Sequence, residues 1–264
     1  MKCVLAIAGS DPMGGAGIQA DIKTITALGA HAVTVITSLT AQNSKGVRSI
    51  HLVPAAFVKK QMEVIVEELV PDAVKIGMLA HESVIAAVAE LLHKYRLSPV
   101  VLDPVLKASA GGNLLDPEAV DILKNKLFPL VQVVTPNIPE AEILAGIRIR
   151  DRDSMMEAAR RIGGVGRAVV VKGGHLDIAC SDLIYDSERF LWVEGQRISA
   201  SNTHGTGCVF SSALAVYMAK GKNVFDATKM AHDFTRSAIM YSYSLGKEWG
   251  SVNPLGLIMS NTVG

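Results

Sequence analysis

Short apolar runs alternate with amphipathic stretches along most of the chain. The apolar runs are rich in β-branched residues and have the length of buried strands; they cover residues 4–8, 32–39, 72–79, 100–105, 131–135 and 167–172. The stretches between them place apolar residues at helical spacing, over about 16–28, 54–69, 82–95 and 117–127, and from 137 onward. This alternation predicts an α/β fold with a mostly parallel central sheet and helices on both faces.

The last third of the chain has a different pattern. Residues 181–198 are typical of short antiparallel strands, and two helices are expected near 208–220 and 224–245. No internal repeat, low-complexity tract or linker interrupts the sequence. We therefore expect a single domain over residues 1–264, with residues 255–264 as a tail.

Composition narrows the possible functions. Lys and Arg (26) nearly balance Asp and Glu (25), so no strong field favours nucleic acid or a membrane surface. No apolar run approaches the roughly 20 residues that span a bilayer. Three widely spaced cysteines argue against a disulfide framework or a zinc cluster and fit a reducing compartment. The expected location is the cytoplasm.

Chemically active residues follow the predicted strands. Strand ends or helix starts carry Gly9, Gln42, Met78, Asp103, Asn137, Lys172 and Cys208. The carboxyl ends of parallel strands share one edge of a sheet, which is where open α/β sheets bind ligands. One cleft is therefore expected to collect these side chains.

The segment 202–208 (NTHGTGC) is the most informative stretch. Gly205 and Gly207 let the backbone turn its N–H groups toward a common point, and the helix that follows adds its own unpaired N–H groups. This combination predicts an anion site. Cys208 at the helix start is expected to have a lowered pKa and to act as a base or a nucleophile; the alternative is an ordinary buried cysteine.

A second glycine-rich loop, at residues 9–17, follows the first strand. It is not a Walker A loop, because Gly15 and Ala16 stand where Lys and Ser or Thr are required. It also lacks the glycine spacing and the acidic residue of a dinucleotide-binding fingerprint. Asp21, one turn inside the following helix, is either a site residue or a solvated surface carboxylate.

Two further positions suggest phosphate and cation chemistry. Lys172 stands at a strand end beside paired glycines, where its ammonium group can meet phosphates. Asn137 and Glu140 are three residues apart at a helix start, so both could reach one solvated cation. The alternative for this pair is a helix cap.

With these residues in view, the chain resembles the hydroxymethylpyrimidine and phosphomethylpyrimidine kinases of thiamine biosynthesis, in the ribokinase-like superfamily. The resemblance spans nearly the whole chain and consists of several separate motifs in order. They are residues 6–21 (AIAGSDPMGGAGIQAD), 40–43 (TAQN), 75–79 (KIGML), 103–105 (DPV), 135–137 (TPN), 172–175 (KGGH), 202–208 (NTHGTGC) and 251–254 (SVNP).

The resemblance implies a three-layer ribokinase-like fold, a homodimer, and phosphorylation of 4-amino-5-hydroxymethyl-2-methylpyrimidine and then of its monophosphate, with ATP and Mg²⁺. It implies catalytic positions at Cys208, Gly205, Gly207 and Lys172, and substrate-binding positions at Gly9, Asp21, Gln42, Met78 and Val105. The ATP-binding positions are then Asp103, Asn137, Lys172, Thr203, Gly205 and Thr206, and the metal positions Asp103 and Glu140. Gln42 carries the amide donor and acceptor that match an aminopyrimidine.

The chain departs from the family pattern in two places. Residues 106–112 (LKASAGG) replace a run like MVAxSGD, in a loop expected to cover the phosphates, and residues 246–251 replace a segment rich in glycine and histidine. Three alternatives remain: a pyridoxal kinase on the same scaffold, a catalytically silent sensor of a thiamine precursor, and a hydride-transferring dinucleotide enzyme. Lys172, Glu140 and Cys208 argue against a sensor, and the missing fingerprint argues against the dinucleotide enzyme.

Overall fold

A computed structural model of the chain describes residues 1–106, 117–164, 167–173, 180–248, 250–256 and 258. Its strands form one sheet and run in the order β3-β2-β1-β4-β5-β6-β7-β8-β9. Their bounds are β1 Cys3–Ser10, β2 His31–Asn43, β3 Gly46–Leu52, β4 Ala73–Ile76, β5 Val100–Leu102, β6 Val133–Val134, β7 Ala168–Val171, β8 Cys180–Tyr185 and β9 Phe190–Gly195. The six central strands, β2, β1, β4, β5, β6 and β7, pair in parallel. The outer strands β3, β8 and β9 are antiparallel to their neighbours.

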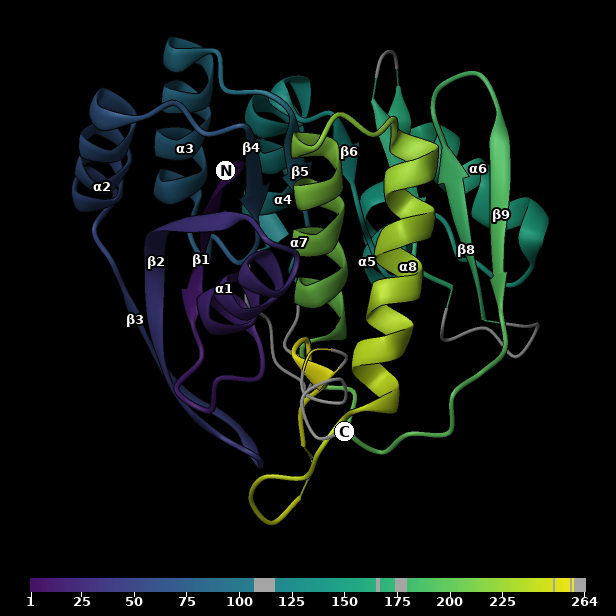
Figure 1. Cartoon of the computed structure of the whole chain (residues 1–264). Helices are drawn as coiled ribbons and strands as arrows, with labels where there is room; N and C mark the ends of the chain where they lie inside the picture. The colour runs from purple at the N-terminus through teal and green to yellow at the C-terminus, as the bar shows by residue number, and fades with distance from the viewer. Residues whose placement is uncertain (107–116, 165–166, 174–179, 249, 257, 259–264) are drawn as a thin grey trace.

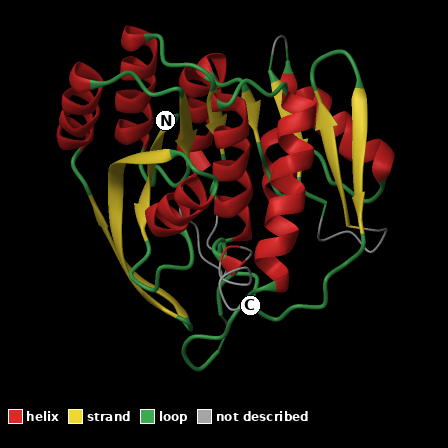
Figure 2. Ribbon diagram, in the orientation of Figure 1, coloured by secondary structure: helices red, strands yellow, loops and turns green. Residues whose placement is uncertain are grey.

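Helices cover both faces of this sheet (Figures 1 and 2). Their bounds are α1 Gly17–Ala27, α2 Ala55–Glu68, α3 Glu82–Tyr95, α4 Pro117–Ile122, α5 Ile138–Ala145, α6 Arg152–Gly163, α7 Thr206–Ala219 and α8 Val224–Met240. The chain continues from α4 through a π-helical turn, Leu123–Leu127, and a 3-10 turn, Phe128–Leu130. The predicted three-layer arrangement is confirmed.

The alternation of side chains along the parallel strands builds two cores. On β1, Leu5 and Ile7 pack into the core beneath α2, α3, α5 and α6, while Val4 and Ala6 pack into the core beneath α1, α7 and α8. Both faces of the central strands are buried, which explains why their sequences are continuous apolar runs.

Three expectations about the elements were wrong or incomplete. Residues 40–43 continue β2 and pair with β3 in an antiparallel hairpin, where the sequence predicted a polar loop. Neither β3 nor α6 was predicted, because β3 mixes polar and apolar residues and has no buried face, and α6 carries many charges. The last helix ends at Met240, five residues before its expected end.

Two expected features lie mostly outside the residues that the structure describes. Of the variant loop at 106–112 only Leu106 lies within the described residues, and of the expected tail only residues 255, 256 and 258 do. Among the described helices, none combines the length and the apolar character that crossing a bilayer requires.

Candidate active site

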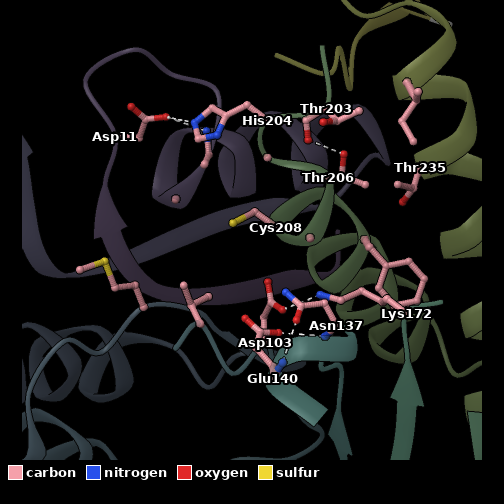
Figure 3. Close-up of a pocket in the computed structure, with 18 of the residues that line it drawn as sticks. Asp11, Asp103, Asn137, Glu140, Lys172, Thr203, His204, Thr206, Cys208 and Thr235 are labelled. Carbon is pink, nitrogen blue, oxygen red and sulfur yellow. Dashed lines mark hydrogen bonds and ion pairs between the residues drawn. The ribbon is translucent and has the colours of Figure 1, made fainter. Parts of the chain in front are cut away.

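A cleft of about 970 Å³ lies along the carboxyl ends of the parallel strands and reaches toward α8 (Figure 3). Its wall includes nearly every residue that the sequence assigned to the site. These are Gly9, Gln42, Met78, Asp103, Val105, Asn137, Glu140, Lys172, Thr203, Gly205, Thr206, Gly207 and Cys208. The sheet edge therefore brings together side chains from positions 9 to 208, as expected from the strand order.

The N-terminus of α7 opens directly into the cleft. Gly205 has a φ of 86°, and a Cβ there would lie 1.8 Å from the carbonyl oxygen of Gly15, so only glycine fits the turn. No side chain caps the helix. The Thr206 N–H donates to the Thr203 carbonyl at 3.3 Å, so the following N–H groups of the turn and the positive end of the dipole are what the helix offers to an anion in the cleft.

Lys172 and Asp103 form an ion pair at this helix start. The Lys172 Nζ lies 2.9 Å from Asp103 Oδ1, and a Cβ on Gly207 would lie 3.2 Å from the same ammonium group. Burial alone would lower the pKa of Lys172, but Asp103 and Glu140 hold it above its ordinary value. Lys172 is therefore a fixed cation beside the uncapped turn of α7.

Asn137 and Glu140 form a capping box on α5, so the helix-cap alternative holds for their mutual contacts. The Asn137 side chain accepts from the Glu140 N–H, and the Glu140 carboxylate accepts from the Asn137 N–H, both at 2.9 Å. Glu140 is 6% exposed and still lines the cleft. Burial raises the pKa of its carboxyl to about 7, with a smaller contribution in the same direction from Asp103, while Lys172 acts against both.

Cys208 lies in the first turn of α7 and is partly exposed to the cleft. The sequence predicted a lowered pKa for this thiol, and that prediction was wrong. Burial raises the pKa of Cys208 to about 11, although the nearby Lys75 ammonium acts in the opposite direction. Desolvation of the thiol outweighs both the Lys75 ammonium and the hydrogen bond from the Gly17 backbone.

Asp21 is neither a surface carboxylate nor part of the cleft wall. Its side chain is fully buried, and its Oδ1 lies 2.7 Å from Lys75 Nζ, which is fully buried as well. Ser212 on α7 donates to the same oxygen at 2.8 Å. The structure does not bring Asp21 to the position of a substrate-contacting residue.

A polar cluster around Gln42 was not predicted from the sequence. His204 Nε2 lies 3.0 Å from Asp11 Oδ2 and 3.4 Å from the amide nitrogen of Gln42. Burial would raise the pKa of Asp11, but hydrogen bonds from His204 and from backbone N–H groups hold it below its ordinary value. Asp11 directly follows β1 and His204 lies just before α7, so the strand-end and helix-start signals could have found both residues.

A second missed group lines the cleft beside α8. His232 Nδ1 lies 2.9 Å from Asp182 Oδ2, and the other oxygen of Asp182 accepts from the Gly173 N–H at 3.0 Å. Thr235 and Arg236 line the same end. These residues lie on an antiparallel strand and within a helix, where no strand-end signal exists.

Comparison with known proteins identifies relatives over almost the whole chain. The model of the family described as phosphomethylpyrimidine kinase matches residues 11–253. A thiamine biosynthesis bifunctional protein of Geobacter sulfurreducens is 49% identical over 95% of the chain, which spans about half (51%) of that protein's length. A hydroxymethylpyrimidine/phosphomethylpyrimidine kinase of Bacillus subtilis is 40% identical, with 94% of this chain and 93% of that one covered.

Solved structures agree with this assignment. The ADP complex of Bacillus subtilis pyridoxal kinase superposes with a TM-score of 0.91 at 34% identity, covering 98% of this chain and 99% of that one. Phosphomethylpyrimidine kinase of Clostridium difficile gives a TM-score of 0.81 at 39% identity, covering 90% and 100%. The ribokinase-like fold is thereby confirmed, and the chain belongs to the phosphomethylpyrimidine kinase family.

Proposed function

We propose that this protein transfers the γ-phosphoryl group of ATP to 4-amino-5-hydroxymethyl-2-methylpyrimidine, and then to its monophosphate, in thiamine biosynthesis. The observation that carries the proposal is the uncapped start of α7, which opens into the cleft beside Lys172 and Cys208. Phosphoryl transfer needs N–H donors and positive charge for the moving group and a base for the nucleophile. The proposed acceptor follows from the Bacillus relative, a hydroxymethylpyrimidine/phosphomethylpyrimidine kinase, and the pathway from the Geobacter relative, a thiamine biosynthesis protein.

In this mechanism the first N–H groups of α7 and the Lys172 ammonium hold the phosphates of ATP. The hydroxymethyl oxygen attacks the γ-phosphorus while its proton passes to the thiolate form of Cys208. The new O–P bond forms as the bond between the γ-phosphorus and its bridging oxygen breaks, and ADP leaves with that electron pair. Cys208 then returns the proton to water. Thr203 and Thr206, on the same turn, are proposed as further contacts to ATP.

The residues of the cleft fit a magnesium ion bound together with ATP. The Asp103 and Glu140 carboxylates line one wall, and Mg²⁺ is usually held by one or two carboxylates plus substrate phosphates. Within the described residues no group of three or more His, Cys, Asp or Glu could hold a metal, so a site built by protein ligands alone is not found there. Bound Mg²⁺ would neutralise charge on the phosphates.

Gln42, Met78 and Val105 are proposed to bind the pyrimidine, together with the backbone at Gly9. Gly9 leaves room at the end of β1, since a Cβ there would lie 2.7 Å from the Ser38 hydroxyl. The Gln42 amide can pair with an amino group and a ring nitrogen, while Met78 contributes a mostly buried apolar surface.

Pyridoxal kinase activity is the second candidate, because several structural neighbours carry that name and pyridoxal also bears a hydroxymethyl group. A coupled ADP-release assay that offers the pyrimidine alcohol, its monophosphate and pyridoxal separately distinguishes the two. Turnover of both pyrimidines well above that of pyridoxal supports the proposal. Pyridoxal as the best acceptor would contradict it, and ligand binding without ADP release would identify a sensor.

We also propose a homodimer in the cytoplasm. The support for a dimer is the family resemblance together with exposed apolar side chains on β2, β3 and α2, which are Leu39, Leu52 and Phe57. Sedimentation equilibrium on the wild type and on Phe57→Lys tests it. A monomeric wild-type protein at micromolar concentration would contradict the dimer.

A further inference from the structure

We propose that Lys75, outside the cleft, is a positioning residue for the transfer: its buried ammonium group stabilises the thiolate form of Cys208. This inference rests on the base role proposed above for Cys208. It assigns a function to a buried ion pair, Asp21–Lys75, that the mechanism otherwise leaves unused.

The direction of the Lys75 side chain supports this role. Its strand neighbours Val74 and Ile76 pack into the core on the other face of the sheet, so Lys75 extends toward the layer of α1 and α7. Its Nζ reaches toward the carboxyl end of β4, because a Cβ on Gly77 would lie only 2.9 Å from it. Glycine at position 77 thus leaves space for an ammonium group under the cleft.

The contacts of Lys75 place it against the helix face that carries the thiol. Asp21 Oδ1 accepts from Lys75 Nζ at 2.7 Å and from Ser212 Oγ at 2.8 Å. Ser212 follows Cys208 by four residues, so the two share one face of α7. The ion pair, the serine and the cysteine therefore form one cluster between α1, β4 and α7.

Four charged groups act on the Cys208 thiol. Lys75 and Lys172 favour the thiolate, whereas Asp21 and Asp103 oppose it. Among these charges Lys75 has the largest effect on the pKa of Cys208, and it offsets part of the desolvation that raises this pKa to about 11. The loss of Lys75 would leave the thiolate rarer still.

Stability alone is a weak reason for this ion pair. Asp21 and Lys75 are both 0% exposed, and the second carboxylate oxygen of Asp21 has no hydrogen-bond partner among the described residues. Replacing buried ion pairs with apolar residues of similar volume is often neutral or stabilising, because both charges lose their hydration on folding. A cation held there at such a cost fits an electrostatic role toward the adjacent thiol.

The test is the rate of Cys208 alkylation by iodoacetamide at several pH values, followed by peptide mass spectrometry. Only the thiolate reacts, so each unit by which the thiol pKa rises slows alkylation about tenfold at a fixed pH. We expect Lys75→Met to slow the reaction by about tenfold or more. Asp21→Asn, which removes an opposing charge, should accelerate it. Cys3, at the start of β1, is the internal control and should react alike in all variants.

Loosened packing would accelerate alkylation of Cys208 in both Lys75→Met and Asp21→Asn. An electrostatic effect slows alkylation in the first variant and accelerates it in the second. Unchanged or faster alkylation of Cys208 in Lys75→Met would overturn the inference. If Lys75→Met does not fold, Gly77→Ala displaces the ammonium while keeping both charges, and it must slow alkylation as well.

A kinetic experiment links the cluster to turnover. Lys75→Met should lower kcat with little change in the KM for ATP, and it should cause no further loss in a Cys208→Ala background. Equal losses of kcat in both backgrounds would contradict the link to Cys208. The alkylation test does not depend on turnover. Failure to phosphorylate the pyrimidine would overturn the proposed function, and the effect of Lys75 on the Cys208 thiol could still be measured.

Discussion

At the scale of single residues, burial raises the pKa of two groups of the cleft against the cations around them. Glu140 and Cys208 both have a raised pKa, because desolvation outweighs the nearby lysines. The position of Cys208 at a helix start predicted a lowered pKa. Sequence spacing shows that a helix dipole is near, but it does not show how deeply the thiol is buried. The protonation states of the site therefore could not be obtained from motifs alone.

The raised pKa of Glu140 predicts a pH-dependent stability. The folded protein holds this proton more tightly than the unfolded chain, so the free energy of unfolding falls as pH rises from about 4.5 to about 7. Between pH 5 and 8 this loss should be on the order of 2 kcal/mol larger in the wild type than in Glu140→Gln. Urea unfolding at the two pH values measures it. Glu90→Gln, an exposed control, should match the wild type, and a Glu140→Gln protein with the wild-type slope would refute the prediction.

Gln42 gives a second prediction at this scale. Gln42→Leu removes both partners of an aminopyrimidine edge and should raise the KM for the pyrimidine by about ten- to a hundredfold, the cost of unpaired polar groups. The KM for ATP should stay near its wild-type value, because Lys172 and the start of α7, and not Gln42, are proposed to hold the phosphates. Steady-state kinetics with each substrate varied in turn measures both KM values. An unchanged pyrimidine KM would remove Gln42 from the pocket.

At the scale of elements, the start of α7 does most to organise the site. Its turn packs against the loop after β1, and its first two turns contact Asp103 through Ser211 and Asp21 through Ser212. The sequence motif 202–208 predicted this element because glycine spacing is a local property. The β2–β3 hairpin could not be predicted in the same way, since its polar strand gains stability only from pairing and its exposed face carries no apolar pattern.

A matched pair of glycine variants tests the two functions of this turn. Gly205→Ala should lower both stability and activity, because its φ of 86° and the 1.8 Å approach to Gly15 admit no Cβ. Gly207→Ala should retain most of the stability and lose activity, because its Cβ crowds only Lys172 and Asp103 at 3.2 and 3.3 Å. Thermal unfolding and kcat separate the two. Equal losses of stability would show that position 207 has no specific role.

At the scale of the whole molecule, the parallel sheet gathers residues far apart in sequence into one cleft. The strand-end rule predicted this from alternation alone, and the positions at Gly9, Gln42, Asp103, Lys172 and Cys208 all line the cleft. The Asp182–His232 end was not predicted, because Asp182 lies within β8 and His232 within α8, and neither residue stands at the end of a parallel strand or at a helix start. The assignment of Asp21 to the substrate site did not hold, because Asp21 on α1 pairs with Lys75 on β4, a contact that local spacing does not reveal.

In the proposed mechanism the thiolate form of Cys208, at the start of α7, takes the proton from the acceptor hydroxyl. The most direct test is kcat for Cys208→Ala, measured together with the dissociation constants of ATP and the pyrimidine by calorimetry. We predict that kcat falls by about 10² to 10⁴ while both ligands bind nearly as in the wild type, because the donors of the turn are backbone groups. Cys3 lies at the start of β1, whereas the cleft lies at its carboxyl end, so Cys3→Ala should keep wild-type turnover. Full turnover by Cys208→Ala would contradict the account.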